Sequence, residues 1–502
     1  MALPLKYYNS SHGSSISQLP FMRLMFWTFL ILSIIVLQLA FGADVRILFF
    51  AVATALCGFL ILNHGGIYDA VSLAGFVFLF NTVFFAILLK TFLGQAIDSN
   101  LYAPFISFLI IFIVALEVLF AIKLVHIIPV GKPLYKPHND LSFLKYLAIV
   151  CYVLGVLLWI LSQLYHVDPR SQFSSQDKGF GGFATIYPIF YMGIVAGTAF
   201  VLLSSNQKKS VNKWLFMMIL TGVIMGLFES RKVIVGLTFG YYFFTSFIYR
   251  HRITSRQIFV GILLVLFIFF IFAPIVHVYR TDLWFLPFSQ RIDYMKSNAD
   301  KMIQSNYLFD YFRRVFNQEY SLNSYQYFGQ NLILIDRFAT IQHSDLIIDS
   351  FMSRNEMGAE LFIQGFDLIL PSFINPNKRS ISLGDQITWE LGLRKYGVVG
   401  FPTVPVIASS FAAKKWLGVL VVPFFIFLLL FLFLKKVGAD IRRNVFSIYF
   451  IVPILVGAHE WSHSQYIVRL FRLFPVQIIL LLLIVFFYHK VRAISIRKST
   501  LL

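Results

Sequence analysis

Long uninterrupted apolar runs constrain this chain more than any other feature of its sequence. The stretch 416–434 (WLGVLVVPFFIFLLLFLFL) contains no charged residue. The hydrocarbon core of a bilayer is about 30 Å thick and takes about 20 apolar residues in a helix. Because 58% of the 502 residues are hydrophobic and only 13% are charged, a soluble core could not bury the apolar surface. The sequence therefore predicts an all-α polytopic membrane protein.

We predict about twelve transmembrane helices from runs of this kind. They cover residues 21–41, 45–62, 69–92, 102–129, 144–163, 183–204, 212–228, 232–249, 257–278, 416–434, 445–458 and 472–489. The polar segments between them divide the chain into three parts. Residues 1–278 hold nine predicted spans, residues 279–415 form one large loop, and residues 416–502 hold three spans and a tail.

The distribution of Lys and Arg predicts the orientation, because cytoplasmic loops are enriched in both residues. With the N-terminus inside, the inner loops hold the basic clusters at 132–145, 208–213, 250–256, 435–443 and 490–498. Both termini are then cytoplasmic. The basic residues responsible for most of the formal net charge of +19 lie in the cytoplasmic loops, where they anchor the protein at the membrane surface. We therefore expect no nucleic-acid partner.

The large loop is then extracytoplasmic and nearly neutral, with fourteen Lys or Arg and thirteen Asp or Glu in residues 279–415. Amphipathic stretches in it predict a folded, helical loop domain. Its last part, 396–413, is apolar but contains Pro402 and Pro405, which would break a spanning helix. We predict a re-entrant or interfacial element there.

A polar sequence, Glu229-Ser230-Arg231-Lys232, interrupts two apolar runs at the predicted outer face. Ionisable residues there are costly unless they pair with each other or face a cavity. A tight turn with snorkelling cations is one interpretation. The other is an anion-binding corner, since the helix amides that follow add positive potential. Arg280, at the outer end of the ninth span, is either an interfacial anchor or a second guanidinium for the same anion.

The large loop holds six further arginines, most of which we expect to be solvated or paired with the acidic residues of the loop; binding an anion is the alternative. They are Arg291, Arg313, Arg314, Arg337, Arg354 and Arg379. Arg337 and Arg354 lie beside apolar runs, so we expect these two to point inward.

The segment His459-Glu460-Trp461-Ser462-His463 matches HExxH, the helix signature of zinc hydrolases. A zinc site, a polar cluster in a catalytic cavity and a structural role are the alternatives. A catalytic zinc site needs a third protein ligand, and no companion motif supplies one. The two cysteines, Cys57 and Cys151, lie inside apolar runs and predict no disulfide framework. We expect no metal and no cofactor.

Three features together suggest a family. About twelve predicted spans enclose one large outer loop late in the chain. A Ser-Arg pair opens a span in FESRKVIVGL, and GFPTVPVIASSFAAKKWLGVLVVPFF leads from the loop into the next span. In these features the chain resembles the oligosaccharide repeat-unit polymerases of the O-antigen (Wzy) type, which are related to the O-antigen ligases. It departs from them at Ala413-Lys414-Lys415-Trp416, where the family has an Asn-Phe-Gly-like approach.

The resemblance implies a GT-C-like glycosyltransferase of the bacterial inner membrane. Such an enzyme would transfer a growing glycan from undecaprenyl diphosphate to a second lipid-linked repeat unit at the periplasmic face, without a metal. Its partners would be the lipid-linked oligosaccharide, membrane lipids and a chain-length regulator. The chain offers Arg231 and Arg280 to stabilise the diphosphate. As the base it offers Glu229, His459 or Glu460, and for substrate binding Lys232, Arg337 and Arg354.

Two other functions remain open at this point. An O-antigen ligase-like enzyme shares the architecture and differs in its acceptor. A lipid-linked oligosaccharide transporter would need charged residues in several spans and repeat symmetry, which the sequence does not display.

Overall fold

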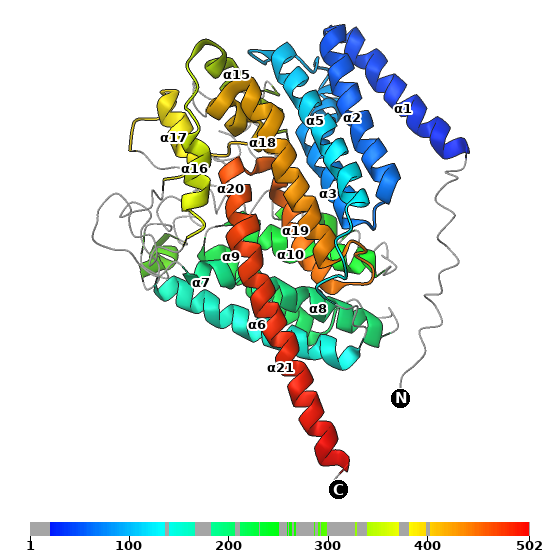
Figure 1. Ribbon diagram of the computed structural model, residues 1–502, viewed down its shortest axis with the longest axis vertical. Coiled ribbons are helices and arrows are strands. Elements are labelled where there is room, and N and C mark those ends of the chain that lie inside the picture. Colours follow the sequence, from blue (N-terminus) through cyan, green and yellow to red (C-terminus); the bar gives the residue numbers. More distant parts are fainter. Residues whose placement is uncertain are drawn as a thin grey trace.

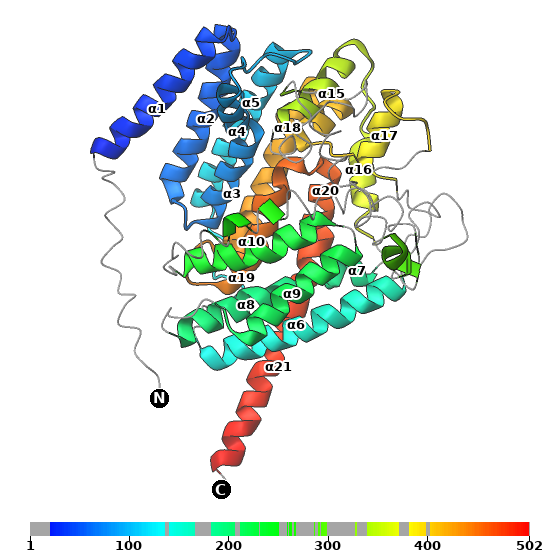
Figure 2. The same cartoon turned by 180° about the vertical axis from the view of Figure 1, so that it is seen from behind.

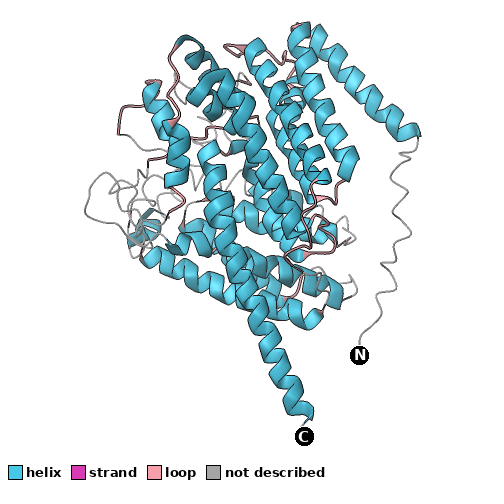
Figure 3. Cartoon of the chain, in the orientation of Figure 1, coloured by secondary structure: helices cyan, strands magenta, loops and turns pink. Residues whose placement is uncertain are grey.

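The described chain is helical throughout. The computed structural model describes residues 21–135, 140–165, 182–205, 211–229, 231–249, 339–370, 381–397 and 402–500, together with short pieces between 259 and 328. Within these ranges it contains helices and loops but no strand (Figure 3). The predicted all-α class is therefore confirmed for the described part of the chain.

The N-terminal helices pack side by side in one group (Figure 1). They are α1 (Phe21–Ala40), α2 (Val45–Gly65), α3 (Ala70–Leu79), η1 (Phe80–Phe84), α4 (Phe85–Phe92) and α5 (Pro104–Ile127). The segment η1 is a single π-helical turn that joins α3 to α4, so the three form one continuous apolar rod. Single π turns inside α-helices are frequent at functional sites.

A second group of helices lies across the first (Figures 1 and 2). Its members are α6 (Leu141–Leu164), α7 (Gly182–Ile186), α8 (Ile189–Ser204), α9 (Lys213–Phe228) and α10 (Lys232–Ile248). The helices α6 and α8 touch backbone to backbone, because a Cβ atom added to Gly155 would lie 2.6 Å from the Cα atom of Phe190. Gly193 of α8 faces the backbone of Tyr152 in the same way. Small residues of this kind allow close helix approach in membrane proteins.

The described part of the large loop contains three helices, α15 (Ile341–Ser353), α16 (Glu360–Asp367) and α17 (Leu383–Glu390). Asp345 of α15 is fully buried. It accepts hydrogen bonds from the backbone N–H groups of Tyr102 (2.7 Å) and Ala103 (3.1 Å) and from the hydroxyl of Ser107 (2.8 Å). Because buried donors left unpaired would cost about 1–3 kcal/mol each, Asp345 fixes α15 to the start of α5.

The C-terminal helices run through the middle of the molecule in Figure 1. They are α18 (Val406–Gly438), α19 (Val445–Gly457), η5 (Ala458–Glu460), α20 (His463–Val468), η6 (Arg469–Leu473) and α21 (Phe474–Thr500). The start of α6 is tied to α21 through Asp140, which accepts from the Ser142 hydroxyl (2.6 Å) and from Nη1 of Arg492 (2.7 Å). These donors, the Ser142 hydroxyl first, hold the pKa of Asp140 below its usual range.

The helix α18 contains a break at Lys414 and Lys415. Lys415 has φ +45° and ψ −131°, a conformation that L residues rarely adopt. Residues 406–413 before the break are all buried, and the N–H groups of Met357 and Gly358 donate to the carbonyls of Ala412 and Ala413. Lys414 forms an ion pair with Glu356. The segment predicted to be re-entrant thus ends in a short, buried helical piece joined at an angle to the long apolar helix.

Six described helices are long and apolar enough to cross a membrane, with 21 to 33 residues each. They are Val45–Gly65, Ala70–Phe92, Pro104–Ile127, Leu141–Leu164, Val406–Gly438 and His463–Ile494. The protein is therefore a membrane protein with several spanning helices. The helices α8, α9, α10 and α19 have 13 to 17 residues, at most about 26 Å at 1.5 Å per residue. The number of twelve spans stays a prediction, and the predicted span 257–278 lies almost entirely outside the described residues.

Candidate functional site

The carboxylate of Glu229 is the centre of a buried polar cluster at the end of α6. Glu229 follows the last residue of α9, and its side chain is only 8% exposed. One carboxylate oxygen accepts hydrogen bonds from Nε1 of Trp159 (2.8 Å) and from Nε2 of Gln163 (3.3 Å), both on α6. The other oxygen lies 3.5 Å from Nη1 of Arg231. We call Glu229, Arg231, Trp159, Gln163 and Arg291 the Glu229 cluster.

Arg231 is the N-cap residue of α10 and is 44% exposed. Its guanidinium therefore reaches solvent while one nitrogen faces Glu229. Lys232 follows Arg231 directly as the first residue of α10, and its side chain lies outside the described residues. The positive end of the α10 helix dipole adds to the charge of Arg231.

Arg291 is one of the six loop arginines that the sequence offered, but not one of the two expected to point inward, and Trp159 and Gln163 were not predicted at all. Its side chain is buried, and Nη1 donates to Oε1 of Gln163 (2.8 Å) and to the carbonyl of Phe228 (3.3 Å). Nε donates to the carbonyl of Leu286 (2.9 Å), whereas Nη2 has no hydrogen-bond partner among the described residues. Burial lowers the pKa of Arg291, and the neighbouring Glu229 carboxylate opposes that shift. Nothing in the local sequence separates Arg291 from the other loop arginines.

Three buried tyrosines, on α8, α10 and α19, stack on one another. The rings of Tyr191 and Tyr241 are stacked with centroids 5.0 Å apart, and Tyr241 lies 6.1 Å from Tyr449. The hydroxyl of Tyr241 donates to the carbonyl of Tyr449 (2.8 Å). All three side chains are buried, so the stack belongs to the interior of the helix bundle.

The HExxH segment does not form one helix. His459 lies in the 3₁₀ turn η5, and His463 begins α20 after Ser462. Ser462 is in an extended conformation and forms a capping box with Gln465, which starts a new helix there. The two histidines therefore do not share a helix face. No group of three or more His, Cys, Asp or Glu residues within the described ranges is arranged to hold a metal ion.

Each histidine of this segment has its own partner. Nδ1 of His459 accepts from the amide of Asn81 on η1 (3.2 Å). Nε2 of His463 lies 3.1 Å from the carbonyl of Leu361, and Nδ1 lies 3.0 Å from the hydroxyl of Ser409. Since a carbonyl only accepts, the proton of His463 is on Nε2. Glu460 is the last residue of η5 and is partly exposed.

Two arginines on the π turn η6, Arg469 and Arg472, were not named from the sequence. The guanidinium of Arg469 lies 3.9 Å from the ring centroid of Trp461, a cation–π contact. It forms no ion pair with any carboxylate in the described part of the chain. Arg472 donates to the carbonyl of Leu368 (3.2 Å) and to the hydroxyl of Thr185 (3.3 Å). Ionisable residues are costly inside a membrane, so two arginines three residues apart in an apolar run could have been predicted from the sequence as candidate functional residues.

Among the remaining predicted residues, the structure describes Arg354, which lies away from the Glu229 cluster. The expectation that Arg354 points inward is wrong, because the residue is exposed and its Nη1 donates to the carbonyl of Glu390 at the end of α17 (2.9 Å). Arg280 and Arg337 lie outside the described residues.

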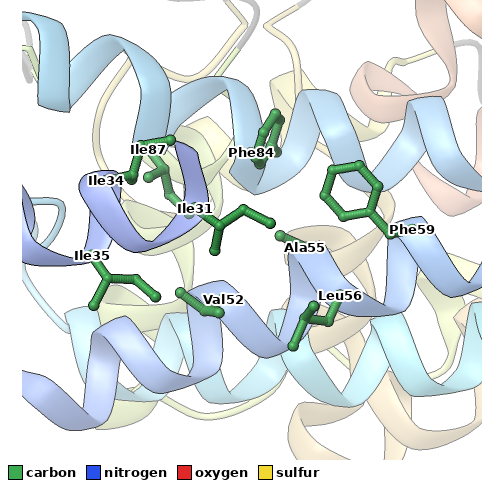
Figure 4. A pocket seen from close by; sticks show the side chains of 9 residues that line it. All are labelled: Ile31, Ile34, Ile35, Val52, Ala55, Leu56, Phe59, Phe84 and Ile87. Carbon is green, nitrogen blue, oxygen red and sulfur yellow. The ribbon is translucent and has the colours of Figure 1, made fainter. Parts of the chain in front are cut away.

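One crevice can be set aside on chemical grounds. Side chains of α1, α2, η1 and α4 enclose it, and all of those in Figure 4 are apolar. It offers no group that could bind an anion or move a proton.

Comparison with protein-family models, curated proteins and solved structures finds no match to this chain. Its chemistry must be argued from the residues. The Glu229 cluster combines one carboxylate with two guanidinium groups and so has a net charge of +1. Such a set can bind an oxyanion and hold a carboxylate ready to accept a proton.

Proposed function

We propose that the protein is a bacterial surface-polysaccharide polymerase. It would transfer a growing glycan from undecaprenyl diphosphate to a second lipid-linked repeat unit. The proposal rests on one observation above all, the buried carboxylate–guanidinium cluster around Glu229 in a helical membrane protein. The sequence resemblance to Wzy-type polymerases supports it.

In this reaction a hydroxyl of the acceptor sugar attacks the anomeric carbon of the donor glycan. A new glycosidic C–O bond forms, and the bond from the anomeric carbon to the lipid diphosphate breaks. The acceptor proton passes to a base, and the diphosphate leaves with the electron pair. The step needs a positioned base and cations near the leaving group.

Glu229 is our choice for the base. Trp159 and Gln163 hold one of its oxygens, and the second oxygen faces the partly exposed Arg231. His459 and Glu460 remain the alternatives from the sequence. His459 already bonds to Asn81, which argues against it.

Arg231 is our choice for the diphosphate. A guanidinium presents a planar fork of N–H donors that matches phosphate oxygens. Each charge-assisted hydrogen bond would contribute about 1.5–3 kcal/mol. Arg291 would hold Gln163 in place and add positive potential. Arg280, Lys232 and Arg337 keep their predicted roles as further cations of the site. Arg354 is exposed and bonds to the carbonyl of Glu390, so we leave it out of the site.

We also propose the finer topology that the sequence predicts. Twelve spans would place both termini in the cytoplasm of the inner membrane and the large loop in the periplasm. In that orientation the Glu229 cluster faces the periplasm, where lipid-linked repeat units are presented.

A glycolipid gel from a host lacking the gene tests the proposal. We expect the long ladder to collapse to a single-repeat band, and wild-type protein to restore it. Arg231→Ala, expressed at the wild-type level, should fail to restore it. Arg46→Ala, at a 73% exposed arginine on α2, is the matched control and should restore it. Loss of every repeat-bearing band would favour a ligase or a transporter. An unchanged ladder in the deletion strain would refute the polymerase.

A further inference from the structure

A second cavity lies far along the sequence from the Glu229 cluster, between α2 and α5. It is an open space of about 670 Å³ near the ends of the two helices. The lining side chains come from the last turns of both helices. They are Leu60, Asn63, His64, Leu119, Ile122 and Lys123.

The lining divides into an apolar and a polar part along the helix axes. Leu60 and Leu119 lie toward the middle of the helices, whereas His64 and Lys123 lie within about a turn of the ends at Gly65 and Ile127. The neighbouring surface is also apolar, with Leu60 57% exposed and Phe120 59% exposed. The cavity therefore opens where an apolar, membrane-facing surface meets the polar ends of two spanning helices.

The cation of this cavity is available to a ligand. Lys123 is exposed and makes no hydrogen bond or ion pair with any described residue. His64 packs edge-on against His126, with ring centroids 4.6 Å apart. His126 is fixed by the carbonyl of Ile122 (2.8 Å) and lies 3.7 Å from Asp69. Asp69 in turn caps α3 through the N–H of Ser72, so its carboxylate is already engaged.

The surroundings of the cavity favour an anion. Helix C-termini carry partial negative charge, which would repel one. At the end of α5 this charge is offset by Lys435, whose Nζ donates to the carbonyls of Val125 (2.7 Å) and Ile128 (2.9 Å). Lys436 binds the carbonyl of Val130 (3.2 Å) in the same region.

We propose that this cavity binds the headgroup of an anionic phospholipid. The phosphate would accept from Lys123, with Asn63 and His64 as further polar contacts. An acyl chain would lie along Leu60 and Leu119. Basic pockets between membrane helices are known to recognise anionic headgroups, and contact of a lysine with phosphate is charge-assisted. The site does not depend on the proposed polymerase activity.

Native mass spectrometry of the full chain, released from bilayers of phosphatidylglycerol and phosphatidylethanolamine, tests the site. We expect the wild type to retain phosphatidylglycerol in preference to phosphatidylethanolamine. Lys123→Gln should reduce this retention several-fold by removing the charge. Leu60→Trp should reduce it by filling the cavity without changing the charge. Lys145→Gln, at an exposed lysine of α6 outside the cavity, should retain the lipid.

Three outcomes would overturn the proposal. An equal loss of retained phosphatidylglycerol in Lys123→Gln and Lys145→Gln would mean that the lipid is attracted to the positively charged surface in general. Equal retention of both lipids by the wild type would mean that the cavity does not distinguish an anionic headgroup from a neutral one. Displacement of the lipid by millimolar inorganic phosphate, with unchanged binding in Leu60→Trp, would mean a site for free phosphate. Because Lys123 and Lys145 are exposed, loss of fold does not account for a difference between them.

Discussion

Glu229 is the residue on which the proposed chemistry depends. Its carboxylate is buried, yet it lies beside a guanidinium that reaches solvent. A buried charge persists only with such partners. The arrangement places a carboxylate that can accept a proton 3.5 Å from a guanidinium that can donate hydrogen bonds to an oxyanion.

Glu229→Gln separates the charge of this residue from its shape. The amide keeps the volume and an acceptor for Trp159, while it loses the charge that faces Arg231. We expect extension of a lipid-linked repeat unit by purified protein to slow by about 10²- to 10⁴-fold, the usual contribution of a general base. Glu360→Gln, at an exposed position of α16, is the control and should extend normally. Wild-type rates in Glu229→Gln would remove Glu229 from the role of base.

At the scale of elements, the seam between α6 and α8 sets the position of the cluster. Trp159 and Gln163 belong to α6, so any shift of that helix moves both donors. The seam is held by glycines with no room for a side chain, since Gly155 meets the backbone of Phe190. Interiors packed this tightly respond to an added methyl group.

Gly155→Ala should therefore lower the melting temperature of the purified protein. The added Cβ atom would lie 2.6 Å from the Phe190 backbone, so the helices must separate. Overpacking of this kind costs about 1–3 kcal/mol. Gly236→Ala is the matched control, because nothing lies within 4 Å of its added Cβ atom, and alanine favours a helix by up to about 1 kcal/mol. Equal melting temperatures in a fluorescence-monitored thermal scan would contradict the close seam.

At the scale of the whole molecule, the proposed topology predicts which residues a membrane-impermeant thiol reagent reaches. The two native cysteines are buried, so the wild type should remain unlabelled. Arg354→Cys, at an exposed position of the large loop, should react in cells whose outer membrane alone is opened. Lys132→Cys, also exposed, should react only after the inner membrane is permeabilised. The reverse pattern would invert the proposed orientation.

The sequence predicted those features that depend on the residues of a single continuous segment. Long apolar runs predicted the helical membrane fold. Four polar residues between two such runs left a tight turn and an anion-binding corner as alternatives, and the structure places Glu229 and Arg231 3.5 Å apart. Arg291 was not predictable because tertiary packing, not its neighbours in sequence, brings it to Gln163. The HExxH match failed as a helix because Ser462 begins a new one. The crossing of the two helix groups has no local sequence signal.

The contacts that attach α16 to the helix bundle affect how substitutions in this region combine. Leu361 is held by His463, Leu368 is held by Arg472, and Gly365 packs directly on Ser464. The three contacts join the same two parts of the chain, so each is made beside the others. Residues that act as a unit give non-additive effects. The effects of single substitutions here would therefore not add up, and paired changes would be needed to reveal how much the position of α16 depends on this junction.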